Sequence, residues 1–284
     1  MIHNLNYFRA RLRPGVRLVA MVKAASYGAG DFEVAQMLQH QGVNYLAVAF
    51  ADEGVLLRER GIRMPIVVLN ADEGSFDLMV AHRLEPEIYN FRSLAFFSKA
   101  VERVGEESYP IHIKLDTGMH RLGFMEGELD MLTETLGETP SVKVATIFSH
   151  LNCSDMPQED RYTREQIARF DRMSGRLAAA LPYPVLRHTA NSAAIERFPE
   201  AQFDMCRLGL GLYGFGFEHN DELKPVSTLK SRIVQLKHLS AGEAVGYGRA
   251  GKLTRDSVTA TVPMGYADGL DRHLGCGRWS MLVA

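Results

Sequence analysis

The sequence predicts an α/β protein that begins with a (β/α)8 TIM barrel and continues into a partial β-rich C-terminal domain. Short apolar runs alternate with amphipathic stretches over most of the chain, and eight such runs occur before residue 217. After that point the rhythm changes to short strands and turn signals without long helices. We therefore expect a barrel over residues 1–216 and a partial β domain over residues 217–284.

The eight runs are interpreted as buried parallel strands because each is short and rich in β-branched or other apolar residues. They cover residues 17–23, 45–50, 65–70, 84–90, 110–116, 142–150, 185–190 and 204–208. Helical periodicity between them predicts helices at 32–41, 92–104 and 163–180. Eight strands joined in this way favour a closed barrel over an open sheet.

The segment after Tyr213 predicts strands at 226–239, 244–247 and 257–263, with a linker at 215–223 that contains Gly, Asn and Asp. The apolar run at 279–284 has the composition of an unfinished strand. A β domain of this size makes a poor independent core. We therefore expect the sequence to be a piece of a longer protein.

Composition narrows the class of function. With 46% hydrophobic and 23% charged residues, the chain is typical of a globular enzyme and unlike a disordered or fibrous protein. A formal net charge of -2 disfavours nucleic acid or an anionic membrane as the partner, so we expect a small-molecule substrate. Cys153, Cys206 and Cys276 lie far apart without a CxxC spacing, which predicts neither a disulfide framework nor a metal site. With no secretory leader or apolar membrane span, the sequence predicts a cytoplasmic protein.

Polar residues gather at the carboxyl ends of the predicted strands, where barrels of this type carry their chemistry. They are Lys23, Lys114, Asp116, Arg121, His150, Asn191, Ser192 and Arg207. Any one of them alone is more readily explained as a salt bridge or a solvated rim residue. Together they predict an active site.

Lys23 follows the apolar strand residues 18–22, and burial of its stem would disfavour a charged ammonium, as a Schiff-base lysine requires. A lysine that ends a strand in water is the alternative from this segment alone. Two GxGxxG patterns occur, at 209–214 and 246–251. The first follows the eighth strand, where barrels bind phosphate through loop amides, whereas the second is interpreted as turns and bulges.

Five ordered blocks extend this pattern over nearly the whole chain. They are AMVKAASYGAG at 20–30, KLDTGMHRLG at 114–123, HTANS at 188–192, RLGLGLYG at 207–214 and GYADG at 265–269. These blocks resemble those of the bacterial alanine racemases, which are fold-type III pyridoxal-phosphate enzymes. The resemblance implies pyridoxal-phosphate-dependent racemisation of L-alanine and D-alanine, which supplies D-alanine for peptidoglycan.

The resemblance also implies roles for individual residues. Lys23 would hold the cofactor covalently and act as the base on one face of the substrate carbon, and Tyr266 would be the base on the other face. The remaining cofactor contacts would come from Tyr27, Arg121, Asn191, Ser192, Arg207, Gly209 and Leu210, with His150 steering Arg207 and Tyr266. The tyrosine would come from the partner subunit, so the resemblance implies a homodimer.

Arg207 matches the residue that faces the pyridine nitrogen of the cofactor. A guanidinium can only donate, so that nitrogen stays unprotonated and the ring is a weaker electron sink, which suits racemisation over other pyridoxal chemistry. Positive charge on His150 and Arg207 would favour the Tyr266 phenolate. Lys114 matches a position that is carbamylated in some relatives, where it would orient Arg121.

The chain also departs from the family pattern. A first strand before Asn4 is absent, as are a C-terminal Cys-Met-Asp block and a later tyrosine, so we expect truncation at both ends or a fusion to a cell-wall ligase. Four alternatives follow: a serine or broad-specificity racemase, a related decarboxylase, a non-catalytic cofactor carrier, and an inactive fragment of a fusion protein. Arg207 argues against the decarboxylase, and Tyr266 against the carrier.

Overall fold

The computed structural model describes residues 1–275 and 277–280. By their contacts the residues divide into two compact units, Met1–Ser227 and Thr228–Ala284. The first unit is the expected barrel and the second is a small β-rich unit, so the predicted fold class is confirmed. Among the residues described, no helix has the length and apolar character of a membrane span.

The strands of the barrel are β1 (Arg17–Met21), β2 (Tyr45–Val48), β3 (Ile66–Val68), β4 (Glu85–Ile88), β5 (Tyr109–Lys114), β6 (Val142–Phe148), β7 (Leu186–His188) and β8 (Met205–Leu208). Its helices are α1 (Ile2–Arg9), α2 (Lys23–Tyr27), α3 (Phe32–His40), α4 (Ala51–Glu59), α5 (Phe76–Ala81), α6 (Phe91–Arg103), α7 (Leu129–Gly137), α8 (Asp160–Ala180) and α9 (Ser192–Arg197). Each strand falls inside or within one residue of its predicted run, and α3, α6 and α8 match the predicted helices.

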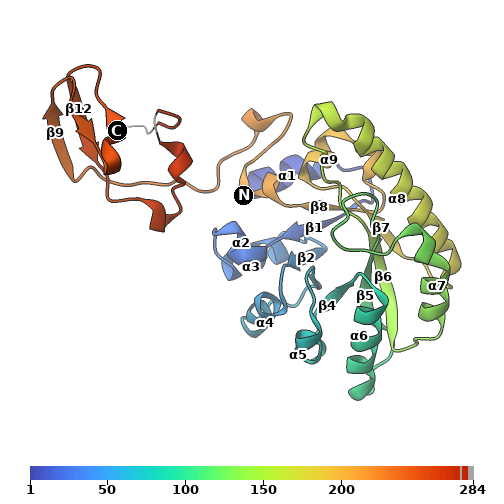
Figure 1. The fold of residues 1–284 in the computed structure, drawn as a ribbon. Coiled ribbons are helices and arrows are strands. Elements are labelled where there is room, and N and C mark those ends of the chain that lie inside the picture. The colour runs from blue at the N-terminus through green and yellow to red at the C-terminus, as the bar shows by residue number, and fades with distance from the viewer. Residues whose placement is uncertain (276, 281–284) are drawn as a thin grey trace. The chain divides into compact units, whose positions relative to one another are not determined.

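The strands form one parallel sheet in the order β7-β6-β5-β4-β3-β2-β1-β8. Between β7 and β8 the sheet closes through two backbone hydrogen bonds, Asp204 N to Arg187 O at 3.0 Å and Arg207 N to Ala190 O at 2.9 Å. The helices lie around the outside of this barrel (Figure 1). Closure brings the carboxyl ends of all eight strands to one rim.

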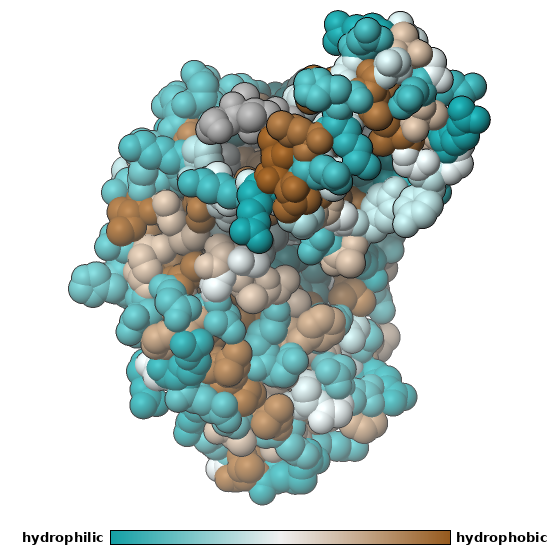
Figure 2. Space-filling model, turned by 90° about the vertical axis from the view of Figure 1, so that its left-hand side faces the viewer, coloured by the Kyte–Doolittle hydropathy of each residue, from teal (hydrophilic) through white to brown (hydrophobic). Residues whose placement is uncertain are grey.

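The outer face of each strand is apolar because it packs under the helices. In α6 the residues Leu94, Phe97 and Val101 recur at helical spacing and are buried, and Asn90 caps the helix by accepting from Ser93 N at 2.7 Å. Most of the large apolar side chains of the barrel are buried. Hydrophilic side chains accordingly predominate on the face shown in Figure 2, with apolar patches among them.

The inside of the barrel has two unlike halves. Alternate residues of β1, β2, β3 and β8 form a small apolar cluster of Val19, Met21, Ala47, Val67 and Met205. Alternate residues of β4 to β8 on the other side are polar or charged, and they are Glu85, Glu87, His112, Lys114, Thr146, His188 and Arg207. A barrel interior of this kind needs partners for its buried polar groups, and those partners build the site.

The second unit contains β9 (Gln235–Leu239), β10 (Ala244–Val245), β11 (Gly251–Lys252) and β12 (Ser257–Thr261), paired antiparallel as β9 with β12 and β10 with β11. The predicted strand at 226–239 was wrong in its first part, because only residues 235–239 face a pairing strand. The second GxGxxG pattern forms the turn between β10 and β11, as predicted. Of the predicted strand at 279–284, residues 281–284 lie outside the described residues, as does Cys276.

Residues 217–227, which the sequence assigned to the second domain, contact the barrel unit. The Asn4 side chain on α1 donates to Lys224 O at 2.8 Å and accepts from Lys224 N at 2.9 Å. Leu223 is buried in the core of the first unit. The division of the chain at residues 216 and 217 stays a prediction.

Candidate active site

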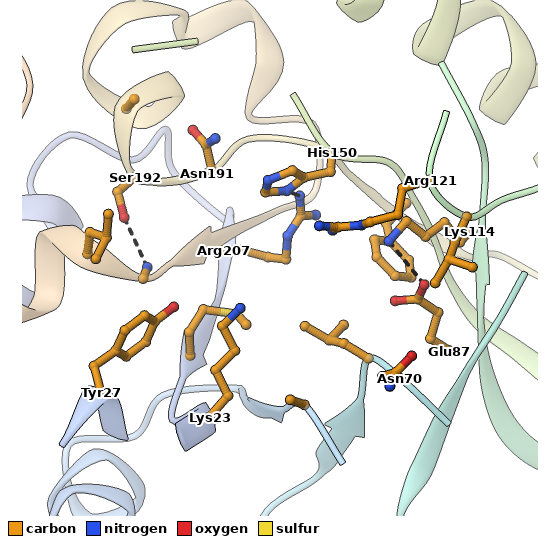
Figure 3. A pocket seen from close by; sticks show the side chains of 18 of the residues that line it. Lys23, Tyr27, Asn70, Glu87, Lys114, Arg121, His150, Asn191, Ser192 and Arg207 are labelled. Atoms are coloured by element: carbon orange, nitrogen blue, oxygen red, sulfur yellow. Dashed lines mark hydrogen bonds and ion pairs between the residues drawn. The ribbon is translucent and has the colours of Figure 1, made fainter. Parts of the chain in front are cut away.

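A pocket of about 750 Å³ opens at the carboxyl ends of the barrel strands. It brings together most of the predicted residues, and Figure 3 shows their side chains converging on it. The predicted residues in its wall are Lys23, Tyr27, Lys114, Arg121, His150, Asn191, Ser192, Arg207, Gly209 and Leu210. Among the described residues that line it, four side chains are cationic and a single one, Glu87, is a carboxylate.

Lys23 begins α2, a turn with unusual backbone geometry. Its next four residues, Ala24 to Tyr27, have φ values of 52, 49, 54 and 55°, so the chain turns in the left-handed sense. Each non-glycine residue in this conformation costs roughly 1–2 kcal/mol, and such strain persists only where neighbours hold it. Ser26 N donates to Val22 O and Gly28 N to Ala24 O, both at 3.0 Å, which closes the turn.

Glu53 on α4 fastens this turn to the neighbouring strand. One oxygen of its carboxylate accepts from Ala24 N, and the other accepts from Ala49 N at 2.6 Å and Phe50 N at 3.1 Å. A carboxylate that accepts several amide hydrogens makes strong, charge-assisted bonds. The position of Lys23 is therefore set by α4 and by the end of β2 as well as by its own strand.

A group of hydroxyls and amides lies opposite Lys23 in the pocket. Ser192 Oγ, at the start of α9, accepts from Gly209 N at 2.9 Å and Gly211 N at 3.2 Å. A Cβ on Gly209 would come within 3.4 Å of the Tyr27 hydroxyl, and one on Gly211 would lie 2.3 Å from the Phe8 ring. The first GxGxxG pattern is thus a tight turn, with a 3-10 helix over Leu210–Tyr213, packed against the groups predicted to hold phosphate.

Arg207 is the most enclosed cation of the pocket. Its guanidinium donates to His188 Nδ1 at 2.9 Å, Ser149 O at 2.7 Å, His150 Nδ1 at 3.1 Å and Thr189 O at 3.1 Å. Burial lowers the pKa of Arg207 to about 10, which still leaves it charged at neutral pH. As expected, it presents a fixed cation that can only donate.

The hydrogen bonds continue from Arg207 across the interior of the barrel, from β8 to β4, and we call this part the barrel floor. The donor and the acceptor of each bond follow from elementary chemistry. Because Arg207 donates to His188 Nδ1, the proton of a neutral His188 sits on Nε2 and is donated to Thr146 Oγ at 3.1 Å. The Thr146 hydroxyl then donates to His112 Nδ1 at 2.8 Å, and His112 Nε2 donates to Glu85 at 2.8 Å. Five residues from five strands form one chain with a cation at one end and a carboxylate at the other.

His150 ends up neutral, contrary to the expectation that it would be charged. Burial, followed by the neighbouring Arg207 cation, lowers the pKa of His150 well below its ordinary value. The same two causes lower the pKa of His188. Since His150 Nδ1 accepts from Arg207, its Nε2 carries the proton. His150 can therefore offer a hydrogen bond to a ligand, but of the pair His150 and Arg207 it is Arg207 that carries the positive charge.

Asp116 was wrongly grouped with the site residues. One of its oxygens accepts from Gly118 N at 2.9 Å and His120 N at 3.1 Å, and the other contacts the His120 ring at 3.2 Å. It shapes the loop after β5 that carries Arg121. Asn191 lines the pocket, but its side-chain oxygen caps α9 by accepting from Ala194 N at 3.0 Å. These two residues orient backbone near the pocket.

Tyr266 lies in the second unit, in a 3-10 helix at Tyr266–Asp268, where its side chain is 68% exposed. The role of Tyr266 in the pocket stays a prediction. Its phenol is accessible on the surface of that unit.

Sequence reasoning missed Glu87, Thr146 and Phe148. Glu87 is fully buried and its Oε1 lies 3.0 Å from Lys114 Nζ. The sequence Glu-Pro-Glu at 85–87 could have identified it, because it places carboxylates inside a predicted buried strand. Buried carboxylates require partners, so this pattern indicates a polar site. The Phe148 ring stacks on His188 and lies beneath Lys114 Nζ at 5.1 Å and Arg207 at 5.4 Å. No pattern in the sequence identified Thr146 or Phe148 as part of the pocket.

Comparison with known proteins gives consistent results. The family model described as "Alanine racemase, N-terminal domain" matches residues 1–216, and "Alanine racemase, C-terminal domain" matches residues 226–284. The chain is 36% identical to "Alanine racemase 2" of Caldanaerobacter subterraneus over 286 residues, which covers 96% of this chain and 72% of that protein. It is 35% identical to the alanine racemase of Sorangium cellulosum, covering 96% and 74% of the two chains.

Solved structures show the same likeness. The alanine racemase from a D-cycloserine-producing Streptomyces lavendulae aligns with a TM-score of 0.88 at 29% identity, covering 95% of this chain and 72% of that one. The alanine racemase of Bartonella henselae, described with covalently bound pyridoxal phosphate, aligns with a TM-score of 0.82 at 26% identity, covering 96% and 75%.

Proposed function

Because this chain belongs to the alanine racemase family, whose reaction interconverts L-alanine and D-alanine with pyridoxal phosphate, we propose that Lys23 and Tyr266 are its two bases. The enzyme acts on a small-molecule substrate. The observation that supports the cofactor site and the role of Lys23 is the convergence of Lys23, Tyr27, Ser192 and Arg207 on one pocket. These side chains are spread over the sequence from residue 23 to residue 207.

The residues of the pocket fit pyridoxal phosphate by their chemistry. The Tyr27 hydroxyl, Ser192 and the turn at Gly209 and Leu210 offer a hydroxyl-rich cradle for the phosphate, in which Ser192 Oγ accepts from Gly209 N at 2.9 Å. Arg207 and Arg121 would face the ring nitrogen and the phenolic oxygen. The predominance of cationic side chains suits an anionic cofactor and a substrate carboxylate.

The cofactor, when bound, draws electron density from the substrate α-carbon and so makes its hydrogen acidic. Lys23 Nζ then takes or returns the proton on one face of that carbon, and Tyr266 Oη does so on the other. Two groups are needed because the proton must leave one face and return to the opposite one. The strained turn after Lys23 and its anchor Glu53 hold the amine in place during this exchange.

His150 supports Tyr266 by a hydrogen bond and not by charge. Its Nε2 proton is free of Arg207, because Arg207 donates to Nδ1. Donation from Nε2 to the Tyr266 oxygen would favour the phenolate, and the Arg207 cation behind the imidazole adds to this effect. His150 thus steers both residues, as the resemblance implies.

We place Tyr266 across the interface of a homodimer, so that each site combines Lys23 of one chain with the tyrosine of the other. We further propose that the enzyme works in the cytoplasm and supplies D-alanine for peptidoglycan. The free, buried thiols of Cys153 and Cys206 suit a reducing compartment.

The first test is the absorbance of lysine-bound cofactor, followed by exchange of the α-proton of each alanine enantiomer in D2O. Lys23→Ala should remove the band. Tyr266→Phe should keep the band and lose exchange mainly from one enantiomer. Equal and undiminished exchange of both enantiomers in the Tyr266→Phe variant would refute the two-base assignment.

A second experiment tests the shared site. Lys23→Ala and Tyr266→Phe chains should each lack racemase activity alone, but a mixed dimer would have one site with both bases intact. After equal mixing by random association, activity should recover to about one quarter of the wild-type value. No recovery, with mixed dimers shown to form, would place both bases on one chain.

A further inference from the structure

Tyr213 is the aromatic residue of the first GxGxxG pattern, and it has no place among the proposed cofactor contacts. It ends the 3-10 helix Leu210–Tyr213, and its side chain is buried with 6% exposure. Its hydroxyl donates to the carbonyl oxygen of Met21, the last residue of β1, at 2.8 Å. Burial raises the pKa of Tyr213, so the hydroxyl keeps the proton that it donates. A residue that follows β8 is therefore fastened to the strand end that precedes Lys23.

The ring of Tyr213 packs against the ring of Tyr27. The two centroids are 4.8 Å apart and the ring planes meet at 49°. Aromatic rings at this separation attract one another beyond the effect of the area that they bury. The Tyr27 side chain lines the pocket and is 38% exposed. Tyr213 thus supports one side of the Tyr27 ring and leaves the rest of it open to a ligand.

The Tyr27 side chain depends on such support, because no polar contact sets its direction. Among the residues that the structure describes, its hydroxyl makes no hydrogen bond (Figure 3). Its backbone has a φ of 55°, in the left-handed region, where a non-glycine residue persists only if its neighbours hold it. Partial burial raises the pKa of Tyr27, so its hydroxyl is protonated and can donate to an anion. The direction of this donor is therefore set by packing.

We propose that Tyr213 is a positioning residue for Tyr27. The bond to the Met21 carbonyl fixes the Tyr213 ring, and this ring holds the Tyr27 hydroxyl beside Ser192 and Gly209, where it donates to an anionic oxygen of the cofactor. A Cβ on Gly209 would lie 3.4 Å from that hydroxyl, so the two groups are neighbours. The inference rests on the proposed function, in which Tyr27 holds the phosphate, and it adds a residue outside the pocket wall on which that contact depends.

The test compares two ligands, pyridoxal phosphate and pyridoxal, which has a hydroxyl in place of the phosphate. Their dissociation constants are measured by absorbance on the cofactor-free full chain, and the ratio of the two constants reports what the phosphate adds to binding. Tyr27→Phe removes the donor and should reduce this ratio about tenfold, the factor expected for one charge-assisted hydrogen bond. Tyr213→Leu removes the supporting ring and should reduce the ratio by a similar factor. Tyr213→Phe keeps the ring without its bond to Met21 and should reduce the ratio about threefold.

A double variant shows whether one tyrosine acts through the other. If Tyr213 acts through the Tyr27 hydroxyl, the chain with both Tyr213→Leu and Tyr27→Phe should have the same ratio as Tyr27→Phe alone. A further tenfold loss in the double variant would mean that the two residues act independently, and it would overturn the proposal.

Tyr109→Phe is the matched control. Tyr109 is also a buried tyrosine, with 3% exposure, and its hydroxyl donates to the carbonyl oxygen of Leu84 at 3.0 Å. It begins β5, at the end of the strand opposite the pocket. Tyr109→Phe should lower the melting temperature about as much as Tyr213→Phe, as followed by circular dichroism, but should keep the wild-type ratio of dissociation constants.

The outcomes separate this inference from the proposed function. A folded Tyr213→Leu chain with the wild-type ratio would refute the positioning role and leave the racemase assignment intact. A wild-type chain that binds pyridoxal phosphate no more tightly than pyridoxal would instead refute the proposed phosphate site. If Tyr213→Leu does not fold, Tyr213→Phe decides the matter, because an undiminished ratio in that variant contradicts the inference.

Discussion

Replacing Thr146 by valine tests the chain of hydrogen bonds across the barrel floor. Valine has nearly the volume of threonine, so the cavity contribution is small, but it can neither donate nor accept. His188 Nε2 would lose its acceptor at 3.1 Å, and His112 Nδ1 would lose its donor at 2.8 Å. Thr146 has 0% exposure, so water cannot easily replace the hydroxyl.

The magnitude follows from the two orphaned groups. A buried polar group left without its partner costs about 1–3 kcal/mol, so Thr146→Val should lower the free energy of unfolding by about 2–6 kcal/mol. A domain has only about 5–15 kcal/mol of stability, so this loss is large. Thr146→Ser keeps the hydroxyl and removes one methyl group, which costs roughly 0.8 kcal/mol.

Urea unfolding followed by far-ultraviolet circular dichroism measures both variants, with the free energy obtained by linear extrapolation. The order of stability should be wild type, then serine, then valine, although valine preserves the volume better. A valine variant as stable as wild type, or more stable than serine, would refute the inference that the buried Thr146 hydroxyl bonds both histidines. Loss of kcat in the valine variant would further show that the chain holds Arg207.

Two other predictions concern the turn at the phosphate end and the buried histidines. Gly211→Ala places a Cβ 2.3 Å from the buried Phe8 ring and should cost about 1–3 kcal/mol by overpacking and weaken cofactor binding, as thermal melts and cofactor titration would show. Gly137→Ala, with open space around its Cβ, is the control, and equal melting temperatures for the two variants would contradict the packing argument. The depressed pKa values of His150 and His188 mean that the unfolded chain binds their protons first as pH falls. Stability due to these residues is therefore present above about pH 6.5, the ordinary histidine value, and falls by about 1.4 kcal/mol per pH unit for each residue below it. Urea midpoints between pH 7 and 5 should show this fall, and His188→Gln should reduce its slope, whereas a wild-type slope in the variant would show that His188 does not contribute.

The sequence alone determined the architecture and most of the pocket wall. Eight short apolar runs predicted the eight barrel strands, because a strand buried on both faces must be apolar over most of its length. A barrel brings the carboxyl ends of its strands to one rim, so the sequence alone placed Lys23, His150 and Arg207 together. The ordered motif blocks made the family and the cofactor predictable.

Only the tertiary structure decided how these groups are paired and charged. Glu87 and Lys114 lie 27 positions apart in sequence, and their ion pair depends on the register of two neighbouring strands. His150 was expected to be positively charged. It is neutral because burial and the neighbouring Arg207 cation lower its pKa. Asp116 does not line the pocket, because backbone amides of the loop after β5 donate to its carboxylate. A sequence pattern shows which residues share a strand end, but the direction of a hydrogen bond and the ionisation of a buried group depend on distances among segments that the pattern does not contain.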